Sequence, residues 1–520
     1  MSSLPDEIEL DLGLDDPDDE PSLRARAARR LGVPPESLEG HGLARRSIDA
    51  RRGRIVFHVV LARRPAPGPL GAPLPRTVGE PRIVIVGDGP CGLFAAYELA
   101  RAGLGAIVVD RGKTVQPRRH DLKGLQKHGR VDPDSNYCFG EGGAGTYSDG
   151  KLYTRAHKRG PIRDVLEILA LHGAPPSILV EARPHIGSNR LPKVVSAIRT
   201  RLSDCGVRFE FGARVVDLVV RGGRAAGVRL ADGRVLDTEA VVVATGHSAR
   251  DVFELLERAG VRLEPKPFAL GVRIEHAQPF VDRLQYGRHA RHPRLPAASY
   301  AVKAQVEGRG VFSFCMCPGG FIVPSSTEPD GLVVNGMSLS RRDSPFANSG
   351  LVVQVEVEDW ERAGLMGALG GVELQRRVEQ AALAAGGGML RAPATRAADF
   401  LCGRGSSTVP GSSYVPGLSA ADVGEVLDAG GVRFSHRLRE ALRSFERRMP
   451  GYAGEEAVLV GVESRTSAPV RAPRDPESLE SPDLRGLHPA GEGAGYAGGI
   501  VSAALDGMRV ARALVGRLPA

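Results

Sequence analysis

The sequence predicts an α/β fold: a discontinuous Rossmann-like domain, an inserted α+β domain, and a small N-terminal βαββ domain. Three observations support this prediction. A βαβ unit with a glycine fingerprint begins near residue 82, and a dense glycine run lies near the C-terminus. From about residue 266 the sequence pattern changes to short β-like runs, polar loops and helical patches. The length of 520 residues allows two or three domains.

The βαβ unit carries the most specific signal. An apolar strand at 83–86 leads into the fingerprint glycines Gly87, Gly89 and Gly92, and a helix and a second strand follow, ending at Asp110. The glycines permit a tight turn, close approach of a pyrophosphate, and packing of the helix on the strand. The helix N-terminus offers N–H groups to phosphates, and Asp110 can accept both ribose hydroxyls. This order predicts a bound adenine dinucleotide.

The N-terminal segment indicates a separate unit. Residues 8–12 alternate like a strand, residues 22–31 favour a helix, and two strands at 43–49 and 54–62 are joined by a turn at 51–53. The predicted parts of the chain are an N-terminal domain at 1–63, a Pro/Gly-rich linker at 64–80, the FAD-binding domain at 81–265 and 456–520, and the substrate or cap domain at 266–455.

Composition excludes several classes of protein. The net charge is +8, but the basic residues are scattered and lack interleaved aromatic residues, so we expect no nucleic-acid binding. No apolar run approaches the roughly 20 residues that span a bilayer. The acidic N-terminus is unlike a secretory signal, which predicts a cytoplasmic protein. Six sparse cysteines argue against a disulfide scaffold.

Three further segments complete the predicted cofactor site. The loop 139–150 is rich in glycine and follows no strand, so we expect it to lie against an extended cofactor. A buried strand ends in Ala-Thr-Gly at 244–246. Near the C-terminus, Glu492 could accept ribityl hydroxyls, and the helix after Gly499 could face the flavin ring. The candidate cofactor-binding residues are Gly87, Gly89, Gly92, Asp110, Arg111, Gly140, Gly142, Gly143, Val215, Ala244, Thr245, Gly246, Gly491, Glu492, Gly498, Gly499 and Ile500.

These segments resemble FAD-binding flavoproteins of the glutathione-reductase-like type, and most closely the branch that includes geranylgeranyl reductases. The chain also resembles a bacterial group known only as FAD-dependent dehydrogenases or oxidoreductases. The sequence segments that carry this resemblance are 47–51, 139–152, 244–251, 266–271, 312–320, 461–467 and 491–500. The resemblance spans nearly the whole chain and implies non-covalent FAD. It leaves the substrate open.

The Cys-Met-Cys motif at Cys315 and Cys317 is the most specific sequence feature outside the predicted cofactor site. Residues two apart on a strand point to the same side, so both thiols could face one cavity. They could exchange electrons with the flavin, line the substrate pocket, or pack as small hydrophobes; the sequence favours pocket lining. No further ligands suggest a metal site.

Two other residues are catalytic candidates. His247 could act as an acid or base near the flavin, or could cap the strand end. Arg465 could hold an acidic substrate or the flavin, or could form a surface salt bridge.

The sequence therefore predicts an FAD-dependent oxidoreductase that passes a hydride or electrons between a donor and a small-molecule or lipid-like substrate. NAD(P)H could serve as a transient donor, because no second nucleotide-binding unit is evident. The alternative is an FAD-holding factor for RNA modification or partner binding, in which the N-terminal domain docks the partner. The oligomeric state is not readable.

Overall fold

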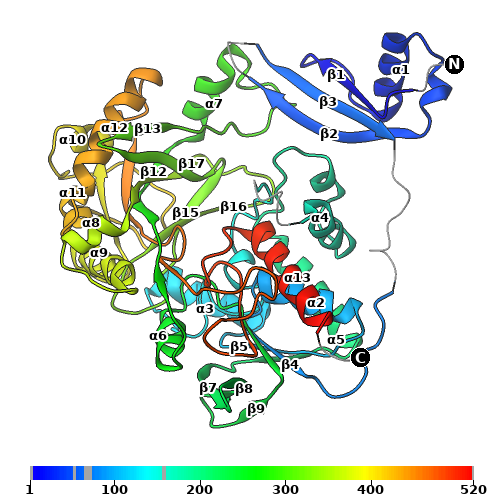
Figure 1. Cartoon of the computed structure of the whole chain (residues 1–520). Coiled ribbons are helices and arrows are strands. Elements are labelled where there is room, and N and C mark those ends of the chain that lie inside the picture. Colours follow the sequence, from blue (N-terminus) through cyan, green and yellow to red (C-terminus); the bar gives the residue numbers. More distant parts are fainter. Residues whose placement is uncertain (1–3, 51–53, 64–72, 155–159, 518–520) are drawn as a thin grey trace.

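The computed structural model describes residues 4–50, 54–63, 73–154 and 160–517 (Figure 1). The expected turn at 51–53 and the first part of the expected linker, 64–72, lie outside these residues. No described helix is both long and apolar enough to cross a membrane.

The N-terminal unit is a βαββ fold, as predicted. Its elements are β1 (Glu7–Leu12), α1 (Glu20–Leu31), β2 (His41–Asp49) and β3 (Val56–Arg63), and the antiparallel sheet has the order β1-β3-β2. Helix α1 begins at Asp19, whose carboxylate accepts from the Ser22 N–H, and ends at Gly32 in the left-handed conformation. Alternate residues of β1 are buried against the helix, which accounts for the sequence pattern.

A parallel sheet forms the centre of the second unit. Its order is β22-β10-β4-β5-β6, with the strands β4 (Ile83–Val86), β5 (Ile107–Asp110), β6 (Arg208–Phe211), β10 (Ala240–Val243) and β22 (Leu487–Pro489). Strands β4, β5, β10 and β22 are buried along their whole length, as expected of a parallel sheet with both faces covered. Because β22 comes from the C-terminal end of the chain, the Rossmann-like fold is discontinuous, as predicted.

Two helices pack side by side beside this sheet, α2 (Pro90–Arg101) and α13 (Ile500–Val515) (Figure 1). A Cβ atom on Gly507 would lie 2.0 Å from the Cys91 carbonyl oxygen, so the close approach of the helices requires glycine there. The remaining elements of this unit are α3 (Val115–His128), α4 (Ile162–Leu171), α5 (Leu191–Asp204), α6 (Arg250–Arg258), and the antiparallel strands β7 (Val215–Arg221), β8 (Arg224–Leu230) and β9 (Val235–Asp237).

A mixed sheet forms the third unit, with the order β13-β14-β17-β12-β20-β18-β19. Its strands are β12 (Phe268–Ala277), β13 (Lys303–Val306), β14 (Arg309–Cys317), β17 (Phe346–Val355), β18 (Ala392–Arg396), β19 (Leu418–Ala420) and β20 (Val458–Glu463). Strand β20 pairs with β12 and β18. The boundary expected at residue 456 is therefore wrong at this point, because this sheet extends to Glu463.

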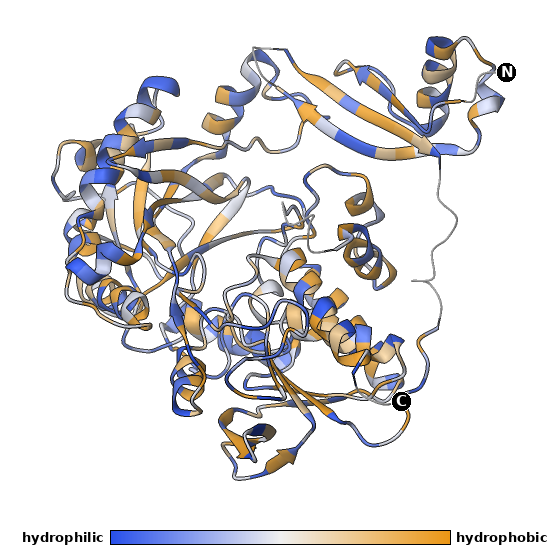
Figure 2. Cartoon of the chain, viewed as in Figure 1, coloured by the Kyte–Doolittle hydropathy of each residue, from blue (hydrophilic) through white to orange (hydrophobic). Residues whose placement is uncertain are grey.

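Helices cover the mixed sheet: α7 (Gln278–Tyr286), α8 (Val357–Arg362), α9 (Gly370–Gly386), α10 (Ala397–Leu401), α11 (Val423–Asp428) and α12 (Phe434–Arg448). The short pairs β15 (Gly320–Pro324) with β16 (Val334–Ser338), and β11 (Glu264–Pro265) with β21 (Val470–Arg471), complete the unit. Figure 2 shows apolar residues concentrated on the strands of the parallel sheet and hydrophilic residues on the outer helices. The site lies where the parallel and mixed sheets meet.

Candidate active site

The fingerprint turn follows β4, and its glycines are required by close packing. Gly87 has a φ of +103°, and a Cβ atom there would lie 2.6 Å from the Ala244 carbonyl oxygen. A Cβ atom on Gly92 would lie 1.9 Å from the Gly87 carbonyl oxygen. These contacts hold the start of α2 directly against the ends of β4 and β10.

The glycine-rich loop 139–150, which is the second glycine loop of the site, lies against the fingerprint turn. Gly143 has a φ of +57°, and a Cβ atom there would lie 2.9 Å from the Gly89 Cα. Arg118 is fully buried beneath this loop, where its guanidinium donates to the carbonyls of Asn136, Tyr137, Glu141 and Gly143 at 2.8–2.9 Å. Arg118 therefore fixes the loop, a role that nothing in the sequence indicated.

One cavity runs between the parallel and mixed sheets, and the N-termini of α2 and α13 both open onto it. Most of the predicted cofactor-binding residues line this cavity, as do three of the four catalytic candidates. The lining residues among them are Gly87, Gly89, Asp110, Arg111, Gly143, Val215, Ala244, Thr245, Gly246, Glu492, Gly499, Ile500, His247, Cys315 and Arg465. Gly92, Gly140, Gly142, Gly491, Gly498 and Cys317 are not part of the lining.

Asp110 and Arg111 are held tightly at the end of β5. The Asp110 carboxylate accepts from the N–H groups of Asp88, Gly112 and Gly140 at 2.8–2.9 Å. Since a carboxylate has about four lone-pair sites, little capacity remains for both ribose hydroxyls. Arg111 forms ion pairs with Asp134 and Asp251 and lies over the Phe139 ring.

Glu492 lies beside the N-terminus of α13. Burial raises the pKa of its carboxyl to about 7, and the Gly499 N–H and the nearby Lys266 charge oppose that rise. Both the free carboxylate and the protonated acid are therefore accessible near neutral pH. The helix end favours negative charge here, because its first N–H groups lack partners within the helix.

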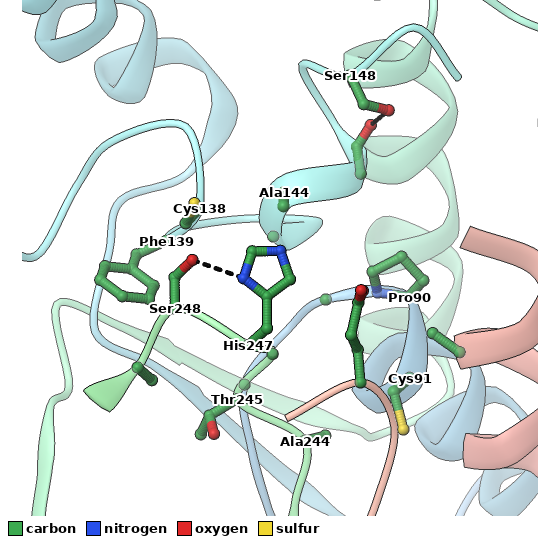
Figure 3. Close-up of a pocket in the computed structure, with 18 of the residues that line it drawn as sticks. Pro90, Cys91, Cys138, Phe139, Ala144, Ser148, Ala244, Thr245, His247 and Ser248 are labelled. Carbon is green, nitrogen blue, oxygen red and sulfur yellow. Dashed lines mark hydrogen bonds between the residues drawn. The ribbon is translucent and has the colours of Figure 1, made fainter. Parts of the chain in front are cut away.

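His247 projects from the loop after β10 toward the second glycine loop, near Ala144 (Figure 3). Its Nδ1 lies 2.8 Å from the Ser248 hydroxyl. Burial lowers the pKa of His247 to about 4, and the charges of Arg465 and Arg250 add to the effect. The imidazole is therefore neutral over the physiological range.

Arg465 belongs to a buried ion-pair network. Its guanidinium donates to the Glu379 carboxylate at 2.8 and 3.0 Å, and Glu379 also accepts from Arg250 at 2.9 Å. Glu379 is 1% exposed. Of the two alternatives for Arg465, the surface salt bridge is thus wrong: the pair is buried, because α9 carries Glu379 into the space beneath the cavity.

The two cysteines meet a lysine from a distant part of the chain. The Lys151 ammonium lies 3.3 Å from the Cys317 sulfur and 3.6 Å from the Cys315 sulfur. Lys151 also pairs with Asp149 at 2.6 Å. Cys315 is exposed and lines the cavity, whereas Cys317 is buried. Among the described residues, no cluster of histidine, cysteine and carboxylate side chains could hold a metal ion.

Three family models match the chain. Residues 267–466 match "FAD-dependent protein, C-terminal domain-like", residues 167–268 match "Pyridine nucleotide-disulphide oxidoreductase", and residues 4–62 match a domain of unknown function. An uncharacterized protein from Clostridium beijerinckii is 43% identical over 440 residues, which cover 84% of this chain and 80% of the relative. The chain belongs to a family of FAD-dependent oxidoreductases.

Solved structures show distant likeness. A geranylgeranyl bacteriochlorophyll reductase-like protein from Thermoplasma acidophilum is 13% identical, with 83% of this chain and 76% of that chain covered and a TM-score of 0.33. L-proline dehydrogenase from P. horikoshii is 12% identical, with 85% and 94% covered and a TM-score of 0.34. Likeness at this level does not identify the reaction.

Proposed function

We propose that the chain holds FAD non-covalently in the cavity and passes a hydride or electrons between a donor and a small-molecule or lipid-like substrate. The observation that carries this proposal is the convergence of two glycine loops and two helix N-termini, those of α2 and α13, on one cavity. The family models add that the class is FAD-dependent.

The residues fit the two ends of FAD. Gly89 and Gly143 approach each other closely and leave backbone at the helix start, where a pyrophosphate would be bound by N–H groups. We place the adenosine near Asp110 and Val215 on the parallel-sheet side. The isoalloxazine would then lie near Gly499, Cys315 and the mixed sheet.

FAD would supply the two-electron chemistry, and the chain's residues would tune and shield it. The N-terminus of α13 and Lys151 place positive potential where negative charge develops on reduction. His247 would donate or accept a hydrogen bond as a neutral imidazole. Arg465 would act as a fixed cation whose position depends on Glu379.

A side chamber of the cavity is our candidate for the substrate. It shares His247, Asn335 and Arg465 with the main cavity and continues between Tyr137, Tyr147 and a valine wall formed by Val323, Val333 and Val334. Ser148, Ser325 and Glu463 also line this chamber, so its lining is about as polar as it is apolar, which suits a small substrate that carries both polar and apolar groups.

The test is anaerobic reduction of the purified protein by NADH and by NADPH, followed by flavin absorbance in a stopped-flow instrument. We expect bleaching by at least one donor and recovery with oxygen or a quinone. Bound FAD that no donor reduces, together with co-purifying RNA, would favour the RNA-modification alternative instead.

The variant Asp110→Asn tests whether the adenosine of FAD lies near Asp110. The variant keeps the shape of the side chain but loses the charge that binds three N–H groups, so FAD retention should fall. Asp237→Asn, on exposed β9, is the matched control and should retain FAD. Equal retention by both variants would contradict the placement of the adenosine near Asp110.

A further inference from the structure

The mixed-sheet wall of the cavity carries a paired-thiol centre, formed by Cys315, Cys317 and Lys151. The lysine ammonium lies within 3.6 Å of both sulfurs, and the Cys317 thiol donates to the Cys315 backbone carbonyl oxygen at 3.3 Å. A lysine that contacts two cysteines, one of them facing the cavity, is not explained by packing of small hydrophobes.

The backbone of β14 departs from a regular strand at the two cysteines. Residues two apart in an extended strand are separated by about 6.6 Å, near the upper limit for disulfide-bonded Cα atoms. The pairing of β14 with β17 shifts between Phe314 and Cys317, and Cys315 has a left-handed φ of +46°. This conformation is rare for a residue other than glycine and marks an irregularity in the strand. The spacing of an extended strand already lies within the disulfide range, and both sulfurs contact the same ammonium, so the geometry permits an intramolecular disulfide.

The charges around the thiols favour one thiolate. Lys151, Arg273 and Arg342 are cations, and they face two carboxylates: Asp149 pairs with Lys151 and Arg342 at 2.6 and 3.1 Å, and Glu463 pairs with Arg273 at 2.5 Å. Glu492 also faces Cys315, so these groups carry one positive charge in excess when Glu492 is protonated and none when it is ionised.

The pKa shifts follow the same pattern. The neighbouring Cys317 side chain is the largest cause that lowers the pKa of Cys315 well below its usual range, and the charges of Lys151 and Arg273 add to it. The pKa of Cys317 is raised by the neighbouring Cys315 side chain and by burial. The neighbouring His185 is neutral, because burial lowers its pKa to about 4. A low-pKa cysteine facing the cavity beside a high-pKa partner is the arrangement of a reactive dithiol.

We propose that Cys315 and Cys317 form a redox-active dithiol that exchanges two electrons with FAD in the cavity. The two sulfurs lose two electrons and two protons as the S–S bond forms. The electrons and one proton pass to oxidised FAD to give the reduced anion, and the second proton passes to solvent. In the reverse direction the disulfide would take up two electrons and two protons and return to the dithiol. This proposal rests on the proposed function, since it requires bound FAD.

The first experiment counts electrons. The purified yellow protein, oxidised beforehand with oxidised glutathione, is titrated anaerobically with dithionite. We expect about four electrons per FAD in the wild type and about two in Cys315→Ser and in Cys317→Ser. Cys402→Ser, an exposed cysteine outside the cavity, is the control and should still take up about four. Two electrons in the wild type would overturn the proposal.

The second experiment does not depend on the flavin. Alkylation and mass spectrometry of the oxidised protein should show a Cys315–Cys317 disulfide. In the reduced protein at pH 7, iodoacetamide should label Cys315 first. Lys151→Met should slow that labelling about tenfold, because the thiolate loses its cation. Absence of the disulfide, or an unchanged labelling rate in Lys151→Met, would overturn the thiol centre. A protein that lacks FAD yet forms the disulfide would instead overturn the proposed function.

Discussion

Glu379→Gln tests whether the buried network beneath the cavity depends on one carboxylate. Glu379 accepts from Arg250, Arg465 and the Ser464 hydroxyl, and its pKa lies at about 2 although burial alone would raise it. Compared with the ordinary value of 4.5, this pKa means that the fold favours the carboxylate over the acid by about 3 kcal/mol. Removing the charge also leaves two buried guanidiniums poorly paired. The expected loss of unfolding free energy at pH 7 is therefore about 3–5 kcal/mol.

The pH dependence has a definite sign. Because the folded-state pKa is depressed, the stabilisation by Glu379 is fully present above about pH 4.5 and disappears as the pH falls toward 2. The difference between wild type and Glu379→Gln should therefore be largest at neutral pH and shrink in acid. Urea unfolding can be followed through Trp360, the single tryptophan of the chain, which is fully buried near the start of α9.

Glu373→Gln is the matched control, because Glu373 lies on the same helix but forms exposed pairs with Arg376 and Arg377. Exposed pairs contribute little, so this variant should lose less than about 1 kcal/mol. If both variants unfold at the same urea concentration, the network does not depend on Glu379 and the reasoning is refuted.

Three further predictions concern the cavity. Gly143→Ala should weaken FAD binding at least about tenfold in equilibrium dialysis, because its Cβ would press on Gly89. Gly222→Ala, at a residue with a similar φ of +56° but with open space around it, should leave FAD binding unchanged. His247→Asn should leave the shape of the pH profile of flavin reduction unchanged between pH 5 and 8, because a pKa of about 4 keeps His247 neutral there; loss of a wild-type step near 6.5 would contradict this. Truncation after residue 480 should abolish FAD binding by removing β22 and α13, and a folded truncated protein that retains FAD in gel filtration would show that these elements are dispensable.

The fold was predictable where local signals agree. The fingerprint at Gly87 places an apolar strand, a tight turn and a helix in fixed order, and each signal has a local physical cause. The boundary at residue 456 failed for a different reason. An apolar strand such as β20 fits either sheet by composition, and only its pairing with β12 decides which sheet it joins.

The site was predictable only in part, because its charges come from distant segments. The spacing of Cys315 and Cys317 predicted that both thiols face one cavity, but only Cys315 lines it and Cys317 is buried. Their cation Lys151 is 164 residues from Cys315 in the sequence. Arg118 and Glu379 were missed for the same reason: their partners are backbone carbonyls or residues from other elements. The one sequence feature that pointed to Lys151 as a site residue was its position directly after the glycine-rich loop 139–150.

The most direct measurement is the identity of the chromophore released from the purified protein by heat and separated by chromatography. The cavity with its glycine loops and the N-termini of α2 and α13 predicts FAD, at about one per chain and released without covalent linkage. A colourless protein, or one that releases only FMN, would contradict the assignment, because FMN has no adenosine or pyrophosphate for the Gly87–Gly92 turn to bind.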